Sequence, residues 1–204
     1  MKTVFVNPER CIGCKQCEMA CAVEHSQSKS LQQAVLETPT PRKRIHVAPG
    51  LYLNSSFPNK CRHCDPAPCR AVCPTGAIWR DGGQGTIVFD GNKCIACAMC
   101  AMVCPFDVIV FHPAPALLRE RAVALKCDHC PDRVAAGRLP ACVEACKVGA
   151  LEFGEINELV KSAGRRLAVA ISVAVGEQPE AAPLPANVQA WRDLGKSISQ
   201  TGRE

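Results

Sequence analysis

The apolar positions of this chain fall in short segments that are separated by turns and by cysteines. Residues 4–6 and 86–89 are apolar stretches of strand length, and residues 45–47 form another. Residues 78–80 are joined to 86–89 by the glycine-rich segment 81–85, an arrangement that predicts a β-hairpin. The pattern therefore predicts short strands joined by turns.

Helical spacing is found mainly towards the C-terminus. Residues 155–167 are predicted to form a helix that ends near Arg165 and Arg166, as suits a helix C-terminus. Residues 178–185 are rich in proline, alanine and glutamate and have the composition of a linker. Beyond them, four apolar residues recur at helical spacing: Val188, Trp191, Leu194 and Ile198. We expect this last helix to pack on its own protein, to fray, or to lie in a groove of a partner.

Sixteen cysteines fall into four groups of four. Groups one and three share the spacing C-x2-C-x2-C-x3-C, group two is C-x2-C-x4-C-x3-C, and group four is C-x2-C-x11-C-x3-C. In chain order the groups are Cys11, Cys14, Cys17 and Cys21; Cys61, Cys64, Cys69 and Cys73; Cys94, Cys97, Cys100 and Cys104; and Cys127, Cys130, Cys142 and Cys146. The tight spacing is typical of a [4Fe–4S] cluster held by three thiolates, with the fourth thiolate on a neighbouring cluster. The sequence therefore predicts four [4Fe–4S] clusters, with every cysteine an iron ligand and short helices between the second and fourth cysteine of each group.

Composition favours metal-bound cysteines over a disulfide scaffold. The chain has 204 residues and only 4% aromatic residues, so its apolar core is expected to be thin, with metal binding contributing folding free energy. A secreted disulfide scaffold is disfavoured by the length, by the lack of a signal peptide and by the spacing. The longest apolar run, residues 167–175, is too short to span a membrane. We expect a cytoplasmic protein without direct membrane insertion, peripheral to a membrane at most through a partner complex.

The basic formal charge does not by itself indicate nucleic-acid binding. Four oxidised clusters of roughly −2 each would change the formal +5 to about −3. A zinc protein that binds nucleic acid is the alternative of another class, but zinc prefers two C-x2-C pairs in one tetrahedral site, which leaves Cys17 and Cys100 surplus. We also find no nucleotide-binding glycine loop and no nucleophile motif, so we expect no catalytic site.

The chain repeats itself with a period of about 80 residues. Residues 4–11 resemble 87–94, and residues 68–78 resemble 141–151. The hairpin joins groups two and three into one two-cluster unit, so groups one and four must pair as a second. We therefore expect an α+β fold of two bacterial-ferredoxin-like two-cluster modules related by internal duplication, with short strands and helices around the clusters. The predicted boundaries are 58–112 for the inner module, 1–57 plus 113–164 for the discontinuous outer module, and 165–204 for a C-terminal extension.

Residues near the cysteines carry weaker signals. Gly13 suits a tight loop that turns its backbone N–H groups towards sulfur. Pro74 and Pro105 follow the fourth cysteines of groups two and three, as in bacterial two-cluster proteins. Ala22 and Lys147 take these places in groups one and four, so the clusters there are expected to be shaped or solvated differently.

Histidines and a basic segment leave alternatives open. His63 and His129 lie inside the C-x2-C loops of groups two and four, either as hydrogen-bond donors to sulfur or as partly exposed loop residues. His25 and His46 belong to no discernible constellation. The basic segment 39–44 is expected to be a solvated loop rather than a docking patch for an acidic redox partner.

The four groups, in this order and spacing, resemble the four-cluster ferredoxin-like electron-transfer subunits of molybdopterin oxidoreductases, such as dimethyl sulfoxide reductase and formate dehydrogenase, and of formate hydrogenlyase. The resemblance covers about residues 1–165. Within that family, four strings look most like the iron–sulfur protein associated with nickel carbon monoxide dehydrogenase. The strings are Cys21-Ala22-Val23-Glu24-His25-Ser26, Cys61-Arg62-His63-Cys64, Met102-Val103-Cys104-Pro105-Phe106 and Gly154-Glu155-Ile156-Asn157-Glu158.

This resemblance implies a ligand set for each cluster and a role for the chain. Cluster one would be held by Cys11, Cys14, Cys17 and Cys146; cluster two by Cys61, Cys64, Cys69 and Cys104; cluster three by Cys73, Cys94, Cys97 and Cys100; and cluster four by Cys21, Cys127, Cys130 and Cys142. The chain would relay electrons from a carbon monoxide dehydrogenase to an acceptor such as a membrane-bound hydrogenase. The alternative is an electron-transfer subunit of a formate dehydrogenase, formate hydrogenlyase or molybdopterin oxidoreductase. In either case the chain is expected to serve an oxidoreductase complex rather than to be an enzyme itself.

Overall fold

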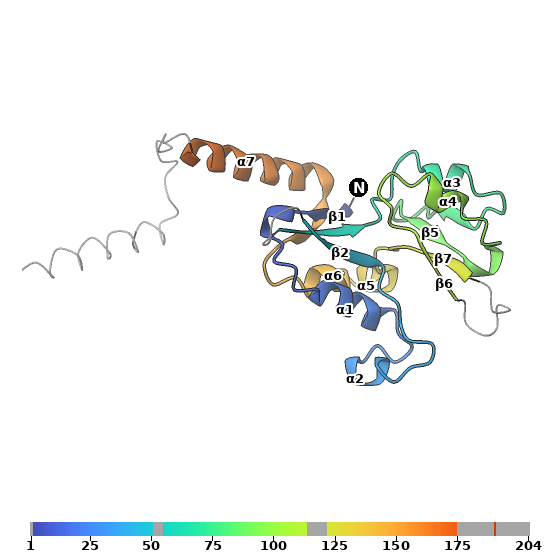
Figure 1. The fold of residues 1–204 in the computed structure, drawn as a ribbon. Coiled ribbons are helices and arrows are strands. Elements are labelled where there is room, and N and C mark those ends of the chain that lie inside the picture. The colour runs from blue at the N-terminus through green and yellow to red at the C-terminus, as the bar shows by residue number, and fades with distance from the viewer. Residues whose placement is uncertain (1, 51–54, 114–121, 175–189, 191–204) are drawn as a thin grey trace, which may run out of the picture. The chain divides into compact units, whose positions relative to one another are not determined.

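The computed structural model describes residues 2–50, 55–113, 122–174 and 190 (Figure 1). The chain divides into two compact units, residues 1–159 and residues 160–204. All sixteen cysteines belong to the first unit, and none of them forms a disulfide. The first unit therefore builds the candidate site.

In the described part of the first unit, eight short strands pair two by two into antiparallel ribbons. The pairs are β1 (Lys2–Val6) with β8 (Leu151–Glu155), β2 (Ile45–Pro49) with β3 (Ser56–Lys60), β4 (Ile78–Arg80) with β5 (Ile87–Phe89), and β6 (Val110–Pro113) with β7 (Ala122–Leu125). A two-stranded ribbon is at best marginally stable in water by itself. These ribbons therefore depend on the apolar residues and cysteines that pack between them.

The ribbon of β1 and β8 holds the two ends of the first unit together. Val4 pairs with Phe153 in its register. Asn7, which is buried at the end of β1, donates its backbone N–H to Ala150 O at 2.8 Å and its side-chain amide to Glu152 Oε1 at 3.0 Å. Because group one follows β1 and group four precedes β8, this ribbon places the first and last cysteine groups beside each other.

The predicted hairpin in the middle of the chain is confirmed. Ile78 in β4 pairs with Phe89 in β5, and the turn is closed by a hydrogen bond from Asp81 N to Thr86 O at 2.8 Å. Ile78 and Ile87 are almost fully buried on the inner face of this ribbon. The hairpin joins group two, which precedes it, to group three, which follows it.

Short helices lie between the second and fourth cysteines of the groups, as predicted. They are α1 (Gln16–Glu24) in group one, α3 (Pro68–Ala71) in group two, α4 (Met99–Met102) in group three, and α5 (Pro131–Ala135) and α6 (Ala141–Glu144) in group four. Single-turn 3-10 helices, Pro8–Arg10 and Gly91–Lys93, precede groups one and three. An additional helix, α2 (Leu31–Ala34), interrupts the long polar segment between groups one and two.

The backbone after the fourth cysteine follows one course in three of the groups. Three residues beyond that cysteine, Gly76, Asp107 and Gly149 all have positive φ angles between 50° and 65°. In group one, α1 instead continues past Cys21 to Glu24. Group four therefore shares the backbone course of the proline-containing groups and group one does not, while the expected difference in cluster shape or solvation stays a prediction.

The apolar core of the described residues consists of two clusters that both contain cysteines. One cluster gathers around Ile78, Ile87, Val108 and Ile109 and includes cysteines of groups two, three and four. The other gathers around Val4, Ile45, Val143 and Leu151 and includes cysteines of groups one and four. The thin core expected from the composition is thus shared with the cysteines, and the module boundaries at 57 and 112 stay a prediction.

The helix predicted over residues 155–167 is present but longer. It is α7 (Ile156–Ala174), and the unit boundary falls within it. The predicted linker 178–185 lies outside the described residues, and so does the predicted helix 188–198 apart from residue 190. None of the helices in the described ranges combines the length and the apolar character that crossing a membrane requires.

Candidate iron–sulfur centres

Eight cysteines of groups two and three line two separate cavities. One cavity is lined by Cys73, Cys94, Cys97 and Cys100, with apolar side chains that include Ile78 and Phe89. The other is lined by Cys61, Cys64, Cys69 and Cys104, with apolar side chains that include Val108 and Ile109. Each cavity combines three cysteines of one group with the fourth cysteine of the other. These are the two sets that the resemblance implied for clusters three and two.

The cysteines of groups one and four also meet. Burial, together with the negative charges of Cys146, Glu18 and Cys11, raises the pKa of Cys17 to about 11. Cys142 is almost fully surrounded by protein, and burial followed by the charges of Cys127, Cys21 and Cys130 raises its pKa well above the usual value. These neighbours fall into the sets implied for clusters one and four, with Cys14 the exposed member of the first.

The C-x2-C loops have a backbone suited to thiolate-bound iron. The third residue of each loop has a positive φ: Gly13 at 70°, His63 at 52°, Ala96 at 59° and His129 at 65°. This conformation turns the N–H of that residue back onto the first cysteine of the loop. His63 N lies 3.4 Å from Cys61 Sγ, and Ala96 N lies 3.4 Å from Cys94 Sγ. Hydrogen bonds to cluster sulfurs are one of the levers by which a protein sets cluster potential.

Without iron, most of the enclosed thiols are strongly held in their protonated form. Burial is the main cause that raises the pKa values of Cys100 and Cys130 to about 11, and it raises those of Cys21 and Cys127 as well. Only thiolates ligate iron, so metal binding at these positions must displace protons. The cavities are therefore built for thiolates that are paired with metal rather than for free thiols.

Cys73 differs from the other cysteines. Burial raises its pKa, but hydrogen bonds from the Thr75 hydroxyl and from the backbone N–H groups of Ile78, Thr75 and Ala77 outweigh burial and lower it. The Thr75 Oγ1 atom lies 3.7 Å from Cys73 Sγ. These hydrogen bonds favour the thiolate form of Cys73, which is the form that ligates iron.

A polar cluster around Cys21 was missed by the sequence reasoning. Arg44 N donates to Cys21 Sγ at 3.3 Å, and His25 Nδ1 lies 2.7 Å from Cys21 O and 3.7 Å from its Sγ. His25 Nε2 contacts the Asp128 carboxylate at 3.1 Å, and Arg44 forms an ion pair with the same carboxylate. The expectation that His25 belongs to no constellation is therefore wrong. Only the fold could reveal this, because Asp128 lies in group four.

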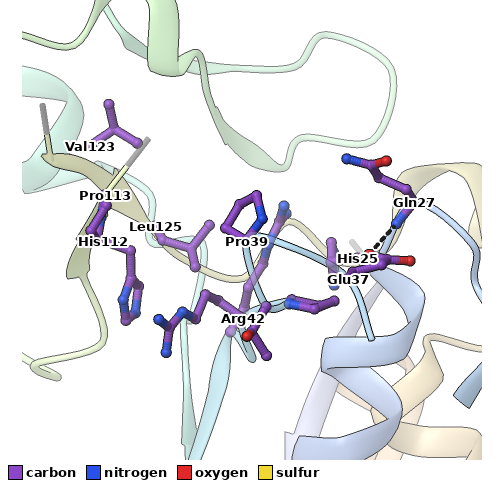
Figure 2. Close-up of a pocket in the computed structure, with 12 residues that line it drawn as sticks. His25, Gln27, Glu37, Pro39, Arg42, His112, Pro113, Val123 and Leu125 are labelled. Carbon is purple, nitrogen blue, oxygen red and sulfur yellow. Dashed lines mark hydrogen bonds between the residues drawn. The ribbon is translucent and has the colours of Figure 1, made fainter. Parts of the chain in front are cut away.

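A surface cavity of about 390 Å³ lies next to this polar cluster (Figure 2). Its lining includes His25, Arg42 and Arg44 on one side and His112 and Leu125 from the β6–β7 ribbon on the other. The basic segment 39–44 contributes to the lining of this cavity, and Pro39, Thr40 and Arg42 are exposed, in agreement with a solvated loop. The alternative, a docking patch for an acidic redox partner, is not tested by the structure.

His63 and His129 are both buried, so of the two alternatives that the sequence left open, partly exposed loop residues is wrong. Their rings lie against each other with centroids 3.8 Å apart. Ile87 N donates to His63 Nδ1 at 3.1 Å, which leaves the proton of a neutral His63 on Nε2. That buried Nε2 atom has no hydrogen-bond partner among the described residues. Because an unsatisfied buried N–H is costly, this atom calls for an acceptor, which a sulfur-rich cluster at nearby Cys127 would supply.

Comparisons with known proteins agree with this geometry. A model of a 4Fe-4S dicluster domain matches residues 53–156, and a second 4Fe-4S dicluster model matches residues 10–78. This protein belongs to the 4Fe–4S dicluster family. Two dicluster domains and sixteen cysteines correspond to four [4Fe–4S] clusters, so the cysteines bind iron–sulfur clusters rather than zinc. Such clusters accept and donate electrons, and the protein is an electron carrier.

Several known proteins are similar to the chain over most of their own length. An iron–sulfur protein of Rhodospirillum rubrum is 37% identical over 76% of this chain and 82% of its own. The thiosulfate reductase electron transfer subunit PhsB of Salmonella typhi is 38% identical over 74% of this chain and 73% of its own. The probable anaerobic dimethyl sulfoxide reductase subunit YnfG of Escherichia coli is 37% identical over 81% of this chain and 79% of its own.

Among solved structures, the active site complex BamBC of benzoyl coenzyme A reductase covers 87% of this chain and 98% of the matched chain. It has a TM-score of 0.37 and 20% identity, which is too low a similarity to transfer either fold details or function.

Proposed function

We propose that this protein is the electron-transfer subunit of an oxidoreductase complex of the molybdopterin class. The observation that carries the proposal is the gathering of sixteen cysteines in one unit of a chain whose relatives include the electron transfer subunit of a thiosulfate reductase and a probable dimethyl sulfoxide reductase subunit. The chain would pass electrons between the catalytic subunit and a redox partner. It supplies thiolates, buried walls and fixed charges to the clusters and no substrate site.

We propose the crossed ligand sets for the four clusters. Support comes from the two cavities of the central groups and from the mutual proximity of cysteines in groups one and four. The sets are Cys11, Cys14, Cys17 and Cys146; Cys61, Cys64, Cys69 and Cys104; Cys73, Cys94, Cys97 and Cys100; and Cys21, Cys127, Cys130 and Cys142. Two modules then follow, an inner one around the β4–β5 hairpin and an outer one around the β1–β8 ribbon.

We further propose that the two halves of the chain arose by internal duplication. The same order of elements occurs twice, with a strand, a 3-10 helix, a cysteine group, a ribbon, a second cysteine group and a strand.

A second candidate partner is a nickel carbon monoxide dehydrogenase, with a membrane-bound hydrogenase or another complex as acceptor. The observation that favours it is the set of four short strings, among them residues 21–26 and 61–64. The relatives named as reductase subunits favour the molybdopterin class instead, and we rank that class first. A cytoplasmic location, peripheral to the membrane through the partner complex, is part of both proposals.

Purification of the affinity-tagged chain from its native host under anaerobic conditions tests the proposal. Molybdenum and pterin in the co-purifying complex would support the first candidate, and nickel would support the second. The same complex should bleach the visible absorbance of the oxidised clusters when it is given its own electron donor: formate for a formate-oxidising enzyme, carbon monoxide for a carbon monoxide dehydrogenase. A chain that purifies without any redox enzyme, and that no such enzyme reduces or oxidises, would refute both.

A further inference from the structure

The residue before the first cysteine is basic in all four groups, but its environment differs. Arg10 and Lys93 precede groups one and three and are exposed. Lys60 and Lys126 precede groups two and four and are 0% and 4% exposed. Lysine is almost never fully buried unless it is paired. At two of the four equivalent positions the basic side chain is thus buried, and at the other two it is exposed to solvent.

The described partners of the two buried lysines are uncharged. Lys60 Nζ donates to Cys61 O at 2.9 Å and lies 3.4 Å from His129 Nε2. Lys126 Nζ donates to Cys127 O at 3.0 Å and to the backbone oxygen of Ile87. In the part of the chain that the structure describes, neither lysine forms an ion pair with a carboxylate. A buried ammonium without a counter-charge is costly, by several kcal/mol in proteins.

The anionic groups that face Lys60 are cysteines, and the Asp128 carboxylate acts on His129 and Cys127 from the same side of group four. Burial lowers the pKa of Lys60, and thiolate charge at Cys127, Cys142 and Cys61 opposes that shift. Cys61 and Cys127 also act on each other, so the first cysteines of the two loops are neighbours although they belong to different ligand sets. The two lysines consequently sit at the junction where group two meets group four.

The paired histidines complete this junction, and they are neutral. Burial, followed by the charges of Lys60 and Lys126, lowers the pKa of His129 to about 3. Burial and the same cationic neighbours lower the pKa of His63 below its usual range. The junction therefore brings together two buried lysines and two buried histidine rings whose centroids lie 3.8 Å apart.

We propose that Lys60 and Lys126 are the built-in counter-charges of two clusters. One is the cluster proposed for Cys61, Cys64, Cys69 and Cys104, and the other is the cluster proposed for Cys21, Cys127, Cys130 and Cys142. This proposal rests on the ligand sets proposed above. A fixed positive charge stabilises the reduced, more negative state of a cluster, and low local dielectric makes the effect stronger than at the surface. The two lysines accordingly raise the reduction potentials of the clusters at the junction.

The test uses the full-length protein with its clusters, under anaerobic conditions. Lys60→Met and Lys126→Met remove the charge and keep most of the side-chain volume. Lys93→Met is the matched control, because Lys93 holds the same place before its group but is exposed. Iron and sulfide are counted, and the midpoint potential of each cluster is measured by redox titration followed by EPR. We expect Lys60→Met and Lys126→Met each to lower the potential of at least one of the two clusters at the junction. Lys93→Met should shift its neighbouring cluster much less.

Two results would overturn the proposal. One is a Lys60→Met protein with four clusters whose potentials all equal those of the wild type. The other is a Lys93→Met shift as large as those at the buried positions. If Lys60→Met loses a cluster, Lys60→Arg decides: retention of four clusters with arginine supports a role for the charge, and loss of the same cluster means that only the shape of lysine matters. A wild-type chain that lacks four clusters would instead refute the ligand sets, which separates the two failures.

Discussion

Loss of the Arg133 side chain should destabilise the proposed outer cysteine module and leave the inner one unaffected. Arg133 lies in α5 of group four, and its guanidinium reaches Glu24 at the end of α1 in group one. Its NH1 atom donates to Glu24 Oε2 at 2.9 Å, its Nε atom donates to Leu139 O at 2.8 Å, and its NH2 atom pairs with Glu144. Arg133→Met therefore removes three hydrogen bonds of the proposed outer module and leaves the central hairpin untouched.

The size of the effect follows from burial. The Arg133 and Glu24 side chains are 9% and 13% exposed, whereas Glu144 is 56% exposed. Removing one partner of a buried pair costs about 3–5 kcal/mol, and an exposed pair contributes at most about 1 kcal/mol. Lys29 Nζ lies 3.4 Å from Glu24 and supplies part of the lost charge. We expect a loss of about 2–3 kcal/mol in the free energy of unfolding.

The assay is anaerobic denaturant unfolding, followed by circular dichroism and by the visible absorbance of the clusters. Arg133→Met should release the iron of groups one and four at lower denaturant than the remaining iron. The control is Arg138→Met, an exposed arginine of the same region, which should change stability by less than about 0.5 kcal/mol. A cost below about 1 kcal/mol for Arg133→Met, or simultaneous loss of all clusters at an earlier midpoint, would refute this reasoning.

Three further predictions concern the ligand sets, pH and the loops. Cys146→Ala should destroy the cluster of Cys11, Cys14 and Cys17 and spare the two clusters of the inner module, whereas Cys104→Ala should damage the inner module. Iron content and EPR of both variants check this. Loss of an inner cluster in Cys146→Ala, or of an outer cluster in Cys104→Ala, would contradict the crossed ligand sets. Burial raises the pKa of Glu24, but Arg133 and Lys29 outweigh it and lower that pKa below the usual 4.5. The pair therefore stabilises the fold fully above about pH 4.5, and this stability is lost as the pH falls through the lowered pKa of folded Glu24. Clusters should be released faster over that pH range, with a weaker pH dependence in Arg133→Met. Gly13→Ala should cost only about 1 kcal/mol in thermal unfolding, because Ala96 adopts the same positive φ in group three and the Ser56 hydroxyl can rotate away; failure to assemble cluster one would show that the loops are not equivalent.

The parts of the fold that depend on local pattern were predictable from the sequence. The hairpin around residues 81–85, the strand that precedes group one and the short helices inside the groups are fixed by turn residues and by cysteine spacing, which act over a few residues. The pairing of groups one and four followed from elimination once the hairpin had joined groups two and three. The β1–β8 register agrees with that pairing.

The polar surroundings of the cysteines were not predictable, because they are assembled from distant segments. His25 acquires its role only when Asp128, more than a hundred residues later, is folded against it. Lys60 and Lys126 look in the sequence like exposed basic residues of the same kind as Lys93, and only the packing of the two loops buries them. The long run of α1 past Cys21 also depends on tertiary contacts, since group four lacks the proline too and yet ends its helix early.

Metal and sulfide analysis of the anaerobically purified wild-type chain tests the central claim most directly. Four clusters with four irons each predict about sixteen irons and sixteen sulfides per chain, and EPR of the reduced protein should show interacting [4Fe–4S] clusters. Zinc in place of iron, or iron for only two clusters after full reconstitution, would contradict the account.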